Sequence, residues 1–159
     1  GVVVARPRSW AVVREFTHED IRDFGEVREA IETLIFVFAA ERHTDEGIAR
    51  LRAAYEREFA AASADEVEAA RIAAGEFHEI AAELAGNEML GELIAVFVTR
   101  LRWLFGQHDD LLGMAEEHRL ILDAVAARDT DTLRWMIPRH LASGQEAAER
   151  RLSDQAYSI

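Results

Sequence analysis

Cysteine is absent from the 159 residues of this chain, and proline occurs only at Pro7 and Pro138. Without cysteine, the chain cannot be a small secreted scaffold held together by disulfides. Aromatic and β-branched residues, which favour strands, are few outside the N-terminus, whereas alanine and glutamate are abundant. Because alanine and glutamate are strong helix formers, this composition predicts an all-α fold. The length is that of one domain able to bury a core.

Basic residues are also scarce: 18 lysines and arginines stand against 30 aspartates and glutamates, which gives a formal net charge of −12. The chain therefore lacks the basic surface that a phosphate backbone requires, and we expect it to contact DNA only through another domain. Its only markedly apolar N-terminal run, residues 1–5, is too short for a signal peptide or a membrane span. We expect a soluble cytoplasmic protein without membrane association.

The N-terminal segment has the pattern of a strand followed by a linker. Residues 1–5 read Gly-Val-Val-Val-Ala, and Pro7 ends this strand because it has no backbone N–H to donate. We predict no later segment that pairs with it. Since a lone strand is not stable by itself, we expect that the chain begins inside a larger protein, with a linker up to about Phe16.

From Thr17 onwards, apolar residues recur with a period of about 3.6, which predicts helices. We expect helices to begin near residues 17, 44, 63, 87, 109 and 130, with a stop at Gly86, a cap at Asn87 and the last end near Arg151. Pro138 is expected to kink the last helix. Helices of this length with short connections predict an antiparallel bundle of six or seven helices.

Three histidines, His78, His118 and His140, each lie on the apolar stripe of a different predicted helix. A single inward-facing histidine is usually a core residue whose nitrogens are bonded to a backbone carbonyl or a side chain. Three such histidines make a shared site more plausible, since one divalent cation satisfies three acceptor nitrogens at once. Both interpretations stay open on spacing alone.

Two arginines, Arg28 and Arg100, are also in register with apolar stripes. Such an arginine either extends its charged end to solvent or pairs with a buried acid. Alternatively, its planar guanidinium binds the carboxylate of a ligand with two hydrogen bonds. We carry Arg28 and Arg100 forward as candidate ligand-binding residues.

Several motifs together resemble a known family, and they span about residues 17–151. They are Phe77-His78, Leu84-Ala85-Gly86-Asn87, the run from Glu117 to Val125, Arg139-His140-Leu141, and the upstream runs 27–32 and 39–42. The chain resembles the C-terminal effector domain (FCD) of FadR-subfamily GntR transcriptional regulators. The resemblance implies that residues 1–16 are a residual wing strand and linker from a missing N-terminal winged-helix DNA-binding domain. Residues 17–159 are then the FCD ligand-binding and dimerisation domain.

The resemblance also implies a helical bundle that binds a small carboxylate metabolite, in many members through a divalent metal held by one aspartate and three histidines. The histidines carry over as His78, His118 and His140, whereas the position of the aspartate, one turn before the first histidine, is Ala74. Three neutral imidazoles can still hold Zn²⁺ or Ni²⁺ when water or a ligand carboxylate completes the shell. In the family, the first-helix arginine, here Arg28, lies near the pocket.

These features suggest a homodimeric sensor in which ligand binding changes how two copies pack and repositions winged helices on operator DNA. One alternative is a metal-free sensor of the same fold, in which histidines and arginine bind an anion or acyl ligand directly. A three-histidine metalloenzyme is disfavoured, because we predict no inward-facing carboxylate or tyrosine beside the histidines and expect Glu76 and Glu79 to face away from His78. We expect that the chain is not an enzyme.

Overall fold

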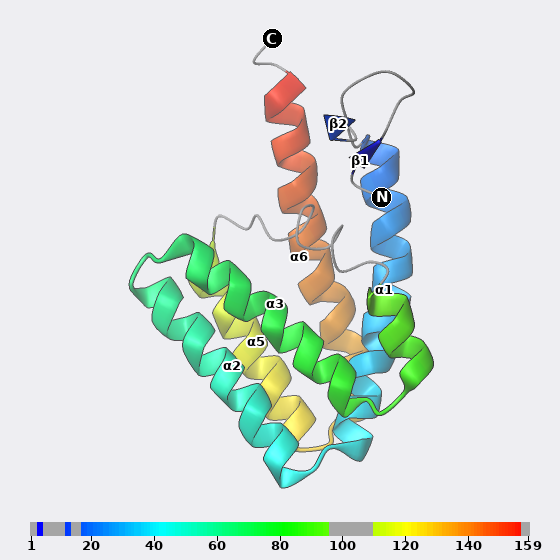
Figure 1. Ribbon diagram of the computed structural model, residues 1–159, viewed down its shortest axis with the longest axis vertical. Coiled ribbons are helices and arrows are strands. Elements are labelled where there is room, and N and C mark those ends of the chain that lie inside the picture. Colours follow the sequence, from blue (N-terminus) through cyan, green and yellow to red (C-terminus); the bar gives the residue numbers. More distant parts are fainter. Residues whose placement is uncertain (1–2, 5–11, 14–16, 96–109, 157–159) are drawn as a thin grey trace.

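The computed structural model describes residues 3–4, 12–13, 17–95 and 110–156, and these residues form an antiparallel helical bundle (Figure 1). The labelled helices are α1 (His18–Arg42), α2 (Asp45–Ser63), α3 (Val67–Leu84), α5 (Leu111–Ala126) and α6 (Thr130–Ala156). Residues 88–95 form a further helical segment. The prediction of an all-α bundle is confirmed.

Two short strands precede the bundle. Strand β1 (Val3–Val4) pairs antiparallel with β2 (Val12–Val13), so that Val3 is opposite Val13 and Val4 is opposite Val12. The predicted strand is present at Val3–Val4, but the prediction that it has no partner is wrong. Valine favours extended backbone, yet two consecutive valines are too few for the alternating pattern by which a strand is recognised in a sequence.

The helix ends follow the capping signals of the sequence. Thr17 forms a capping box with Asp20, and the Thr44 side chain accepts a hydrogen bond from the first turn of α2. Gly86 has a φ of +56°, a left-handed conformation that glycine adopts at little cost after a helix. The Asn87 side chain accepts a hydrogen bond from the Leu90 N–H at 3.2 Å and so caps the next helical segment, as predicted.

Two predicted boundaries shift in the structure. The third helix, expected from about residue 63, begins at Val67, because α2 continues to Ser63 and Asp65 then turns with a positive φ of 57°. Helix α6 passes through Pro138 and ends at Ala156, beyond the expected end near Arg151. The second half of the predicted fourth helix, with Arg100, lies outside the described residues. Among the described residues, no helix is both long and apolar enough to cross a membrane.

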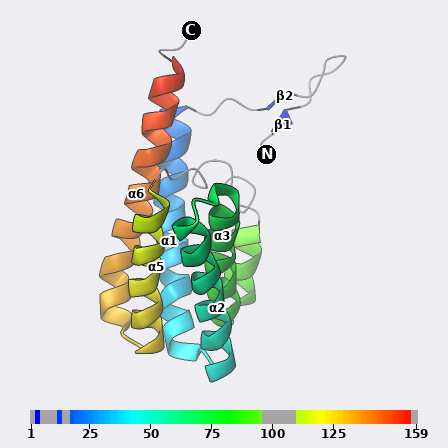
Figure 2. The same cartoon turned by 90° about the vertical axis from the view of Figure 1, so that its left-hand side faces the viewer.

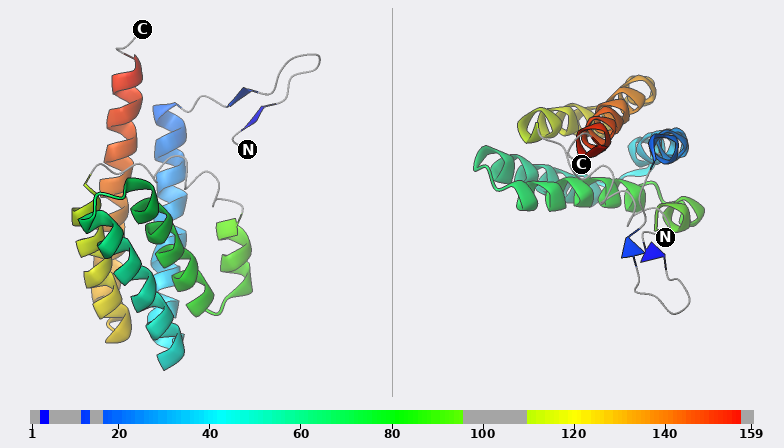
Figure 3. Two further views of the ribbon diagram at one scale, coloured as in Figure 1. Left: turned by 60° about the vertical axis from the view of Figure 1, so that its left-hand side comes forward. Right: turned by 90° about the horizontal axis from the view of Figure 1, so that it is seen from above.

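The five labelled helices form a closed ring in the order α1, α3, α2, α5 and α6, and α6 packs back on α1. Helices α1 and α6 run antiparallel along one side, and α2 and α3 form an antiparallel pair on the other (Figures 2 and 3). Alanines such as Ala54, Ala70 and Ala81 are buried on α2 and α3. Their small side chains let these two helices pack closely.

Large apolar side chains fill much of the middle of the ring, and Phe36, Leu51, Phe77, Ile121 and Leu133 are among those that are fully buried. Within the described part of the chain, the same interior also encloses four ionisable side chains, which are Glu32, Glu58, His118 and His140. Burying such groups is costly unless they are bonded to one another or to a ligand. These four residues therefore mark the part of the interior that suits a functional site.

Candidate metal centre

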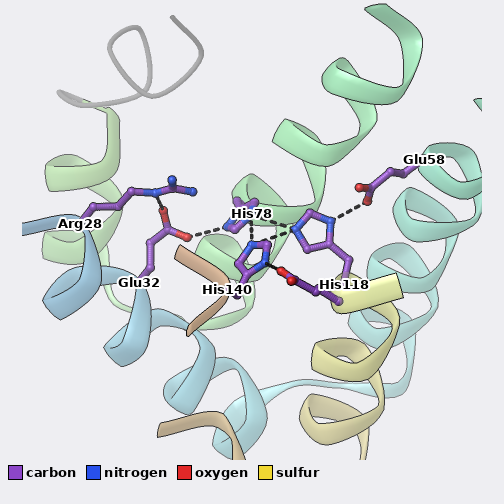
Figure 4. Close-up of polar contacts among 7 residues, drawn as sticks. Arg28, Glu32, Glu58, His78, His118 and His140 are labelled. Atoms are coloured by element: carbon purple, nitrogen blue, oxygen red, sulfur yellow. Dashed lines mark hydrogen bonds and ion pairs between the residues drawn. The ribbon is translucent and has the colours of Figure 1, made fainter. Parts of the chain in front are cut away.

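The three predicted histidines meet at the centre of the helix ring (Figure 4). The Nε2 atom of His118 lies 3.2 Å from the Nε2 atoms of both His78 and His140, and the Nε2 atoms of His140 and His78 are 3.4 Å apart. Three side chains from α3, α5 and α6 thus present the same ring nitrogen to a common point. The prediction that these histidines face inward together is confirmed.

The rings are held in place by aromatic neighbours and by burial. His118 is 0% exposed and His140 is 6% exposed. Phe77 stacks on the His118 ring with centroids 4.5 Å apart, and Phe36 contacts the edge of the His78 ring with centroids 5.6 Å apart. Such packing limits each imidazole to a narrow range of orientations.

Each histidine is also held by a glutamate at its other ring nitrogen. The Nδ1 atom of His78 lies 2.5 Å from Oε2 of Glu32 on α1, that of His118 lies 2.6 Å from Oε2 of Glu58 on α2, and that of His140 lies 2.7 Å from Oε2 of Glu117 on α5. All five labelled helices therefore contribute a side chain to one cluster. A carboxylate that orients a histidine in this way is a recurrent feature of metal sites.

Sequence reasoning missed these three glutamates, and its prediction that no inward-facing carboxylate lies beside the histidines is wrong. Two of them had a signal in the helical spacing. Glu32 follows Arg28 by four residues and so shares its inward face, and Glu58 follows the buried Leu51 by seven. Glu117 gave no such signal, and its side chain is 43% exposed although its carboxylate bonds to His140.

The glutamates determine which nitrogen of each ring carries the proton. A carboxylate accepts hydrogen bonds, so each Nδ1 donates its N–H and each neutral ring keeps a lone pair on Nε2. Three Nε2 lone pairs then point at one another across 3.2 to 3.4 Å. Lone pairs repel one another unless a cation lies between them. The three Nε2 lone pairs therefore suit a bound cation, whereas a purely apolar core would give them no partner.

The size of the nitrogen triangle agrees with this conclusion. Tetrahedral coordination with Zn–N distances of about 2.0–2.1 Å requires nitrogen atoms about 3.3–3.4 Å apart. The three observed separations of 3.2, 3.2 and 3.4 Å are close to that requirement. His78, His118 and His140 are the residues that could hold the ion, and their Nε2 separations already suit it.

The surroundings of His140 and Glu32 keep these two residues in the charge states that the site requires. Burial lowers the pKa of His140 to about 3, so that its ring is neutral near pH 7 and is available as a ligand. Burial alone would raise the pKa of the Glu32 carboxyl, but the positive charge of Arg28, the interaction with the His78 ring and the hydrogen bonds from both side chains outweigh it and hold that pKa well below its usual range. Glu32 is therefore ionised.

The structure places Arg28 beside Glu32 and not free in a pocket. Its Nε atom donates to Oε1 of Glu32 at 2.5 Å, and the two side chains are 10% and 2% exposed. Arg28, Glu32 and His78 thus form a continuous chain of charge-assisted hydrogen bonds (Figure 4). This is the pairing with a buried acid that the sequence left open, and the predicted ligand contact of Arg28 stays a prediction.

Three other positions named from the sequence can also be located. Ala74 is buried at 7% exposure and packs in an apolar cluster with Ala61, Ala62, Ala70, Leu111 and Met114. Glu76 faces outward, since its carboxylate forms an ion pair with Arg57 at 2.7 Å. Glu79 lines a surface groove with Glu83 and Asn87. As predicted, neither glutamate joins the histidine cluster.

Comparison with known proteins identifies the family. The family model for the FCD domain matches residues 23–143. A transcriptional regulator of Bacillus subtilis, LutR, is 30% identical over 133 residues, covering 78% of this chain and 59% of the relative. The transcriptional repressor NanR of Salmonella schwarzengrund is 29% identical over 160 residues, covering 88% of this chain and 58% of the relative. The chain thus spans about three fifths of the length of these curated relatives.

Solved structures show the same fold. E. coli McbR/YncC aligns with a TM-score of 0.78 at 18% identity, covering 97% of this chain and 78% of that one. Streptococcus agalactiae GntR aligns with a TM-score of 0.71 at 18% identity, covering 91% and 74%. The chain belongs to the FCD domain family, the effector-sensing domain of GntR-family transcriptional regulators, and is a regulatory domain rather than an enzyme.

Proposed function

We propose that this FCD domain senses a small carboxylate metabolite through one divalent metal ion, Zn²⁺ or Ni²⁺, held by His78, His118 and His140. The observation that carries the proposal is the convergence of three Nε2 atoms within 3.4 Å of one another, each on a ring whose Nδ1 is held by a glutamate. When bound, the metal would supply a cationic acceptor for an anionic ligand group, because three protein ligands leave coordination positions open.

The chain's own residues prepare this site. Glu32, Glu58 and Glu117 keep each proton on Nδ1 and so keep each Nε2 free for the metal. Each carboxylate bonds to the Nδ1 side of its ring, away from the Nε2 triangle where a ligand would bind. Figure 4 shows this arrangement for Glu32 and Glu58. This placement suits binding, since none of the three is positioned as a general base towards that position.

The metal-free alternative, in which protonated histidines and arginine bind an anion directly, has less support. Burial lowers the pKa of His140 to about 3, which leaves this ring without a positive charge near pH 7. The Arg28 guanidinium already pairs with Glu32 at 2.5 Å. An anion that binds Arg28 would therefore share its guanidinium with the buried carboxylate of Glu32.

For the whole protein, we propose a homodimeric cytoplasmic regulator in which this domain controls DNA binding by an N-terminal winged helix. The curated relatives are named as HTH-type transcriptional regulators and repressors, and the chain covers 59% and 58% of their length. The antiparallel pair β1–β2 is compatible with a wing strand and linker in residues 1–16. Ligand would act by preferring one arrangement of the two copies over the other.

The test is a calorimetric titration of the chelator-treated domain with Zn²⁺ or Ni²⁺, followed by thermal-shift assays with a panel of small carboxylates. We expect one ion bound per chain, and carboxylate-induced stabilisation only in the metal-loaded protein. The His118→Ala variant should bind no ion at the same concentrations, because it removes the ligand that lies 3.2 Å from both others. Equal carboxylate stabilisation with and without metal would support the metal-free sensor instead.

A further inference from the structure

The direct ligands of the proposed metal ion do not compensate its positive charge. Three neutral imidazoles and a divalent ion carry a net charge of +2 in a site where His118 is 0% and His140 is 6% exposed. Ala74 shares a helix face with His78, four residues before it, but contributes no charge and lies among apolar side chains. Before a ligand binds, the protein's own compensating charge comes from the carboxylates that touch the histidines.

The three glutamates at the Nδ1 atoms differ in how well they can compensate the positive charge of the metal ion. Glu32 shares its charge between His78 and the Arg28 guanidinium, which it contacts at 2.5 Å. The Glu117 side chain is 43% exposed, so water and salt screen its charge. Glu58 is 0% exposed and bonds at 2.6 Å to His118, which is also 0% exposed. Its charge is therefore the least screened by solvent.

Among the three histidines, His118 is best placed to relay the effect of the Glu58 carboxylate to the metal ion. It is the shared corner of the two shortest Nε2 separations, both 3.2 Å. A carboxylate bonded to Nδ1–H makes the opposite nitrogen of the ring a stronger donor to a metal. Stacking of Phe77 on the ring, with planes 16° apart, keeps the imidazole aligned between Glu58 and the Nε2 triangle.

We propose that Glu58 is the positioning residue that sets the metal affinity of this domain, by supplying through His118 the negative charge that is lacking at Ala74. The inference rests on the proposed metal site. It adds that two helix positions, 58 on α2 and 74 on α3, are alternative places for the same charge. A carboxylate at either position should be enough for tight binding.

The experiment compares the Zn²⁺ affinity of four proteins by competition with a chromophoric chelator. Glu58→Gln keeps the shape and a hydrogen-bond acceptor but removes the charge, and we expect it to weaken binding by about 10–100-fold. Glu117→Gln makes the same change at the exposed carboxylate, and we expect less than about a threefold loss there because of screening. The double variant Glu58→Gln/Ala74→Asp should recover most of the wild-type affinity.

The outcomes separate this proposal from the proposed function. If the wild-type domain binds no ion, the metal site itself is wrong. If it binds one ion but Glu58→Gln and Glu117→Gln lose affinity equally, or Ala74→Asp restores nothing, the role of Glu58 is refuted while the metal site stands. Circular dichroism checks that each variant folds. Should Glu58→Gln not fold alone, the same change is made in the Ala74→Asp protein, where a loss of more than about tenfold would contradict the proposal.

Discussion

Acidification of the metal-free domain should destabilise it through His140, and the size of the effect follows from the burial of this ring. Burial lowers the pKa of His140 to about 3 from the usual 6.5. Between these two pH values, the unfolded chain binds a proton at His140 and the folded chain does not. The unfolding free energy therefore falls as the pH falls through about 6.5 towards 3, with a limiting slope of about 1.4 kcal/mol per pH unit.

Between about pH 7.5 and pH 5.5, this linkage predicts a loss of about 1.4 kcal/mol for His140 alone. For a domain of this size, that corresponds to a fall in Tm of about 4 °C. Glu32 adds nothing in this range, because its lowered pKa keeps it ionised and its stabilising contribution is lost only as the pH falls below its ordinary pKa of 4.5.

The assay is urea denaturation in the presence of chelator at both pH values, for the wild-type domain and for His140→Gln. The glutamine cannot titrate, so the variant should lose about 1.4 kcal/mol less than the wild type over the same range. His18→Gln is the control, because His18 is an exposed residue at the start of α1. An equal loss in the wild type and in His140→Gln would refute the conclusion that this ring is neutral and buried.

Three further predictions concern single side chains. His118→Ala should abolish metal retention, measured by elemental analysis after desalting. Retention at the wild-type level would mean that the histidines are not the metal ligands. Ala74→Asp should cost the metal-free domain about 1–3 kcal/mol in urea denaturation, since position 74 is buried at 7% exposure, yet tighten Zn²⁺ binding in the chelator competition. No gain in affinity would mean that this face of α3 does not reach the ion. Arg28→Met should lower the unfolding free energy by about 3 kcal/mol or more, because it removes the arginine that pairs with the buried carboxylate of Glu32. The matched change Arg50→Met at an exposed ion pair should cost less than about 1 kcal/mol, and equal effects would contradict the burial argument.

Helical periodicity and capping residues were enough to predict the bundle. Thr17, Thr44 and Asn87 each accept a backbone hydrogen bond at a helix start, and Gly86 adopts a positive φ, all as their residue types predict. These signals are local, so they can be recognised in the sequence. The pairing of Val3–Val4 with Val12–Val13 was missed, because it depends on contact between two segments that are each only two residues long.

The inward direction of the histidines was also predictable, whereas the pairing of each histidine with one glutamate was not. Each histidine repeats the apolar spacing of its own helix, which fixes the face but not the distance to another helix. The glutamates were missed because each bonds to a histidine far away in the sequence, with separations of 46 residues for Glu32, 60 for Glu58 and 23 for Glu117. Only the closed packing of the five-helix ring brings these groups together.

The central claim is that His78, His118 and His140 hold one metal ion, and the most direct measurement is the metal content of the untagged domain purified without chelator. Elemental analysis should give close to one mole of a single transition metal, Zn or Ni, per mole of chain. The same value should return after chelation, addition of the ion and desalting. A value near zero after the ion has been offered back would contradict the claim, and the cluster of three histidines and three glutamates would then be a metal-free hydrogen-bonded core.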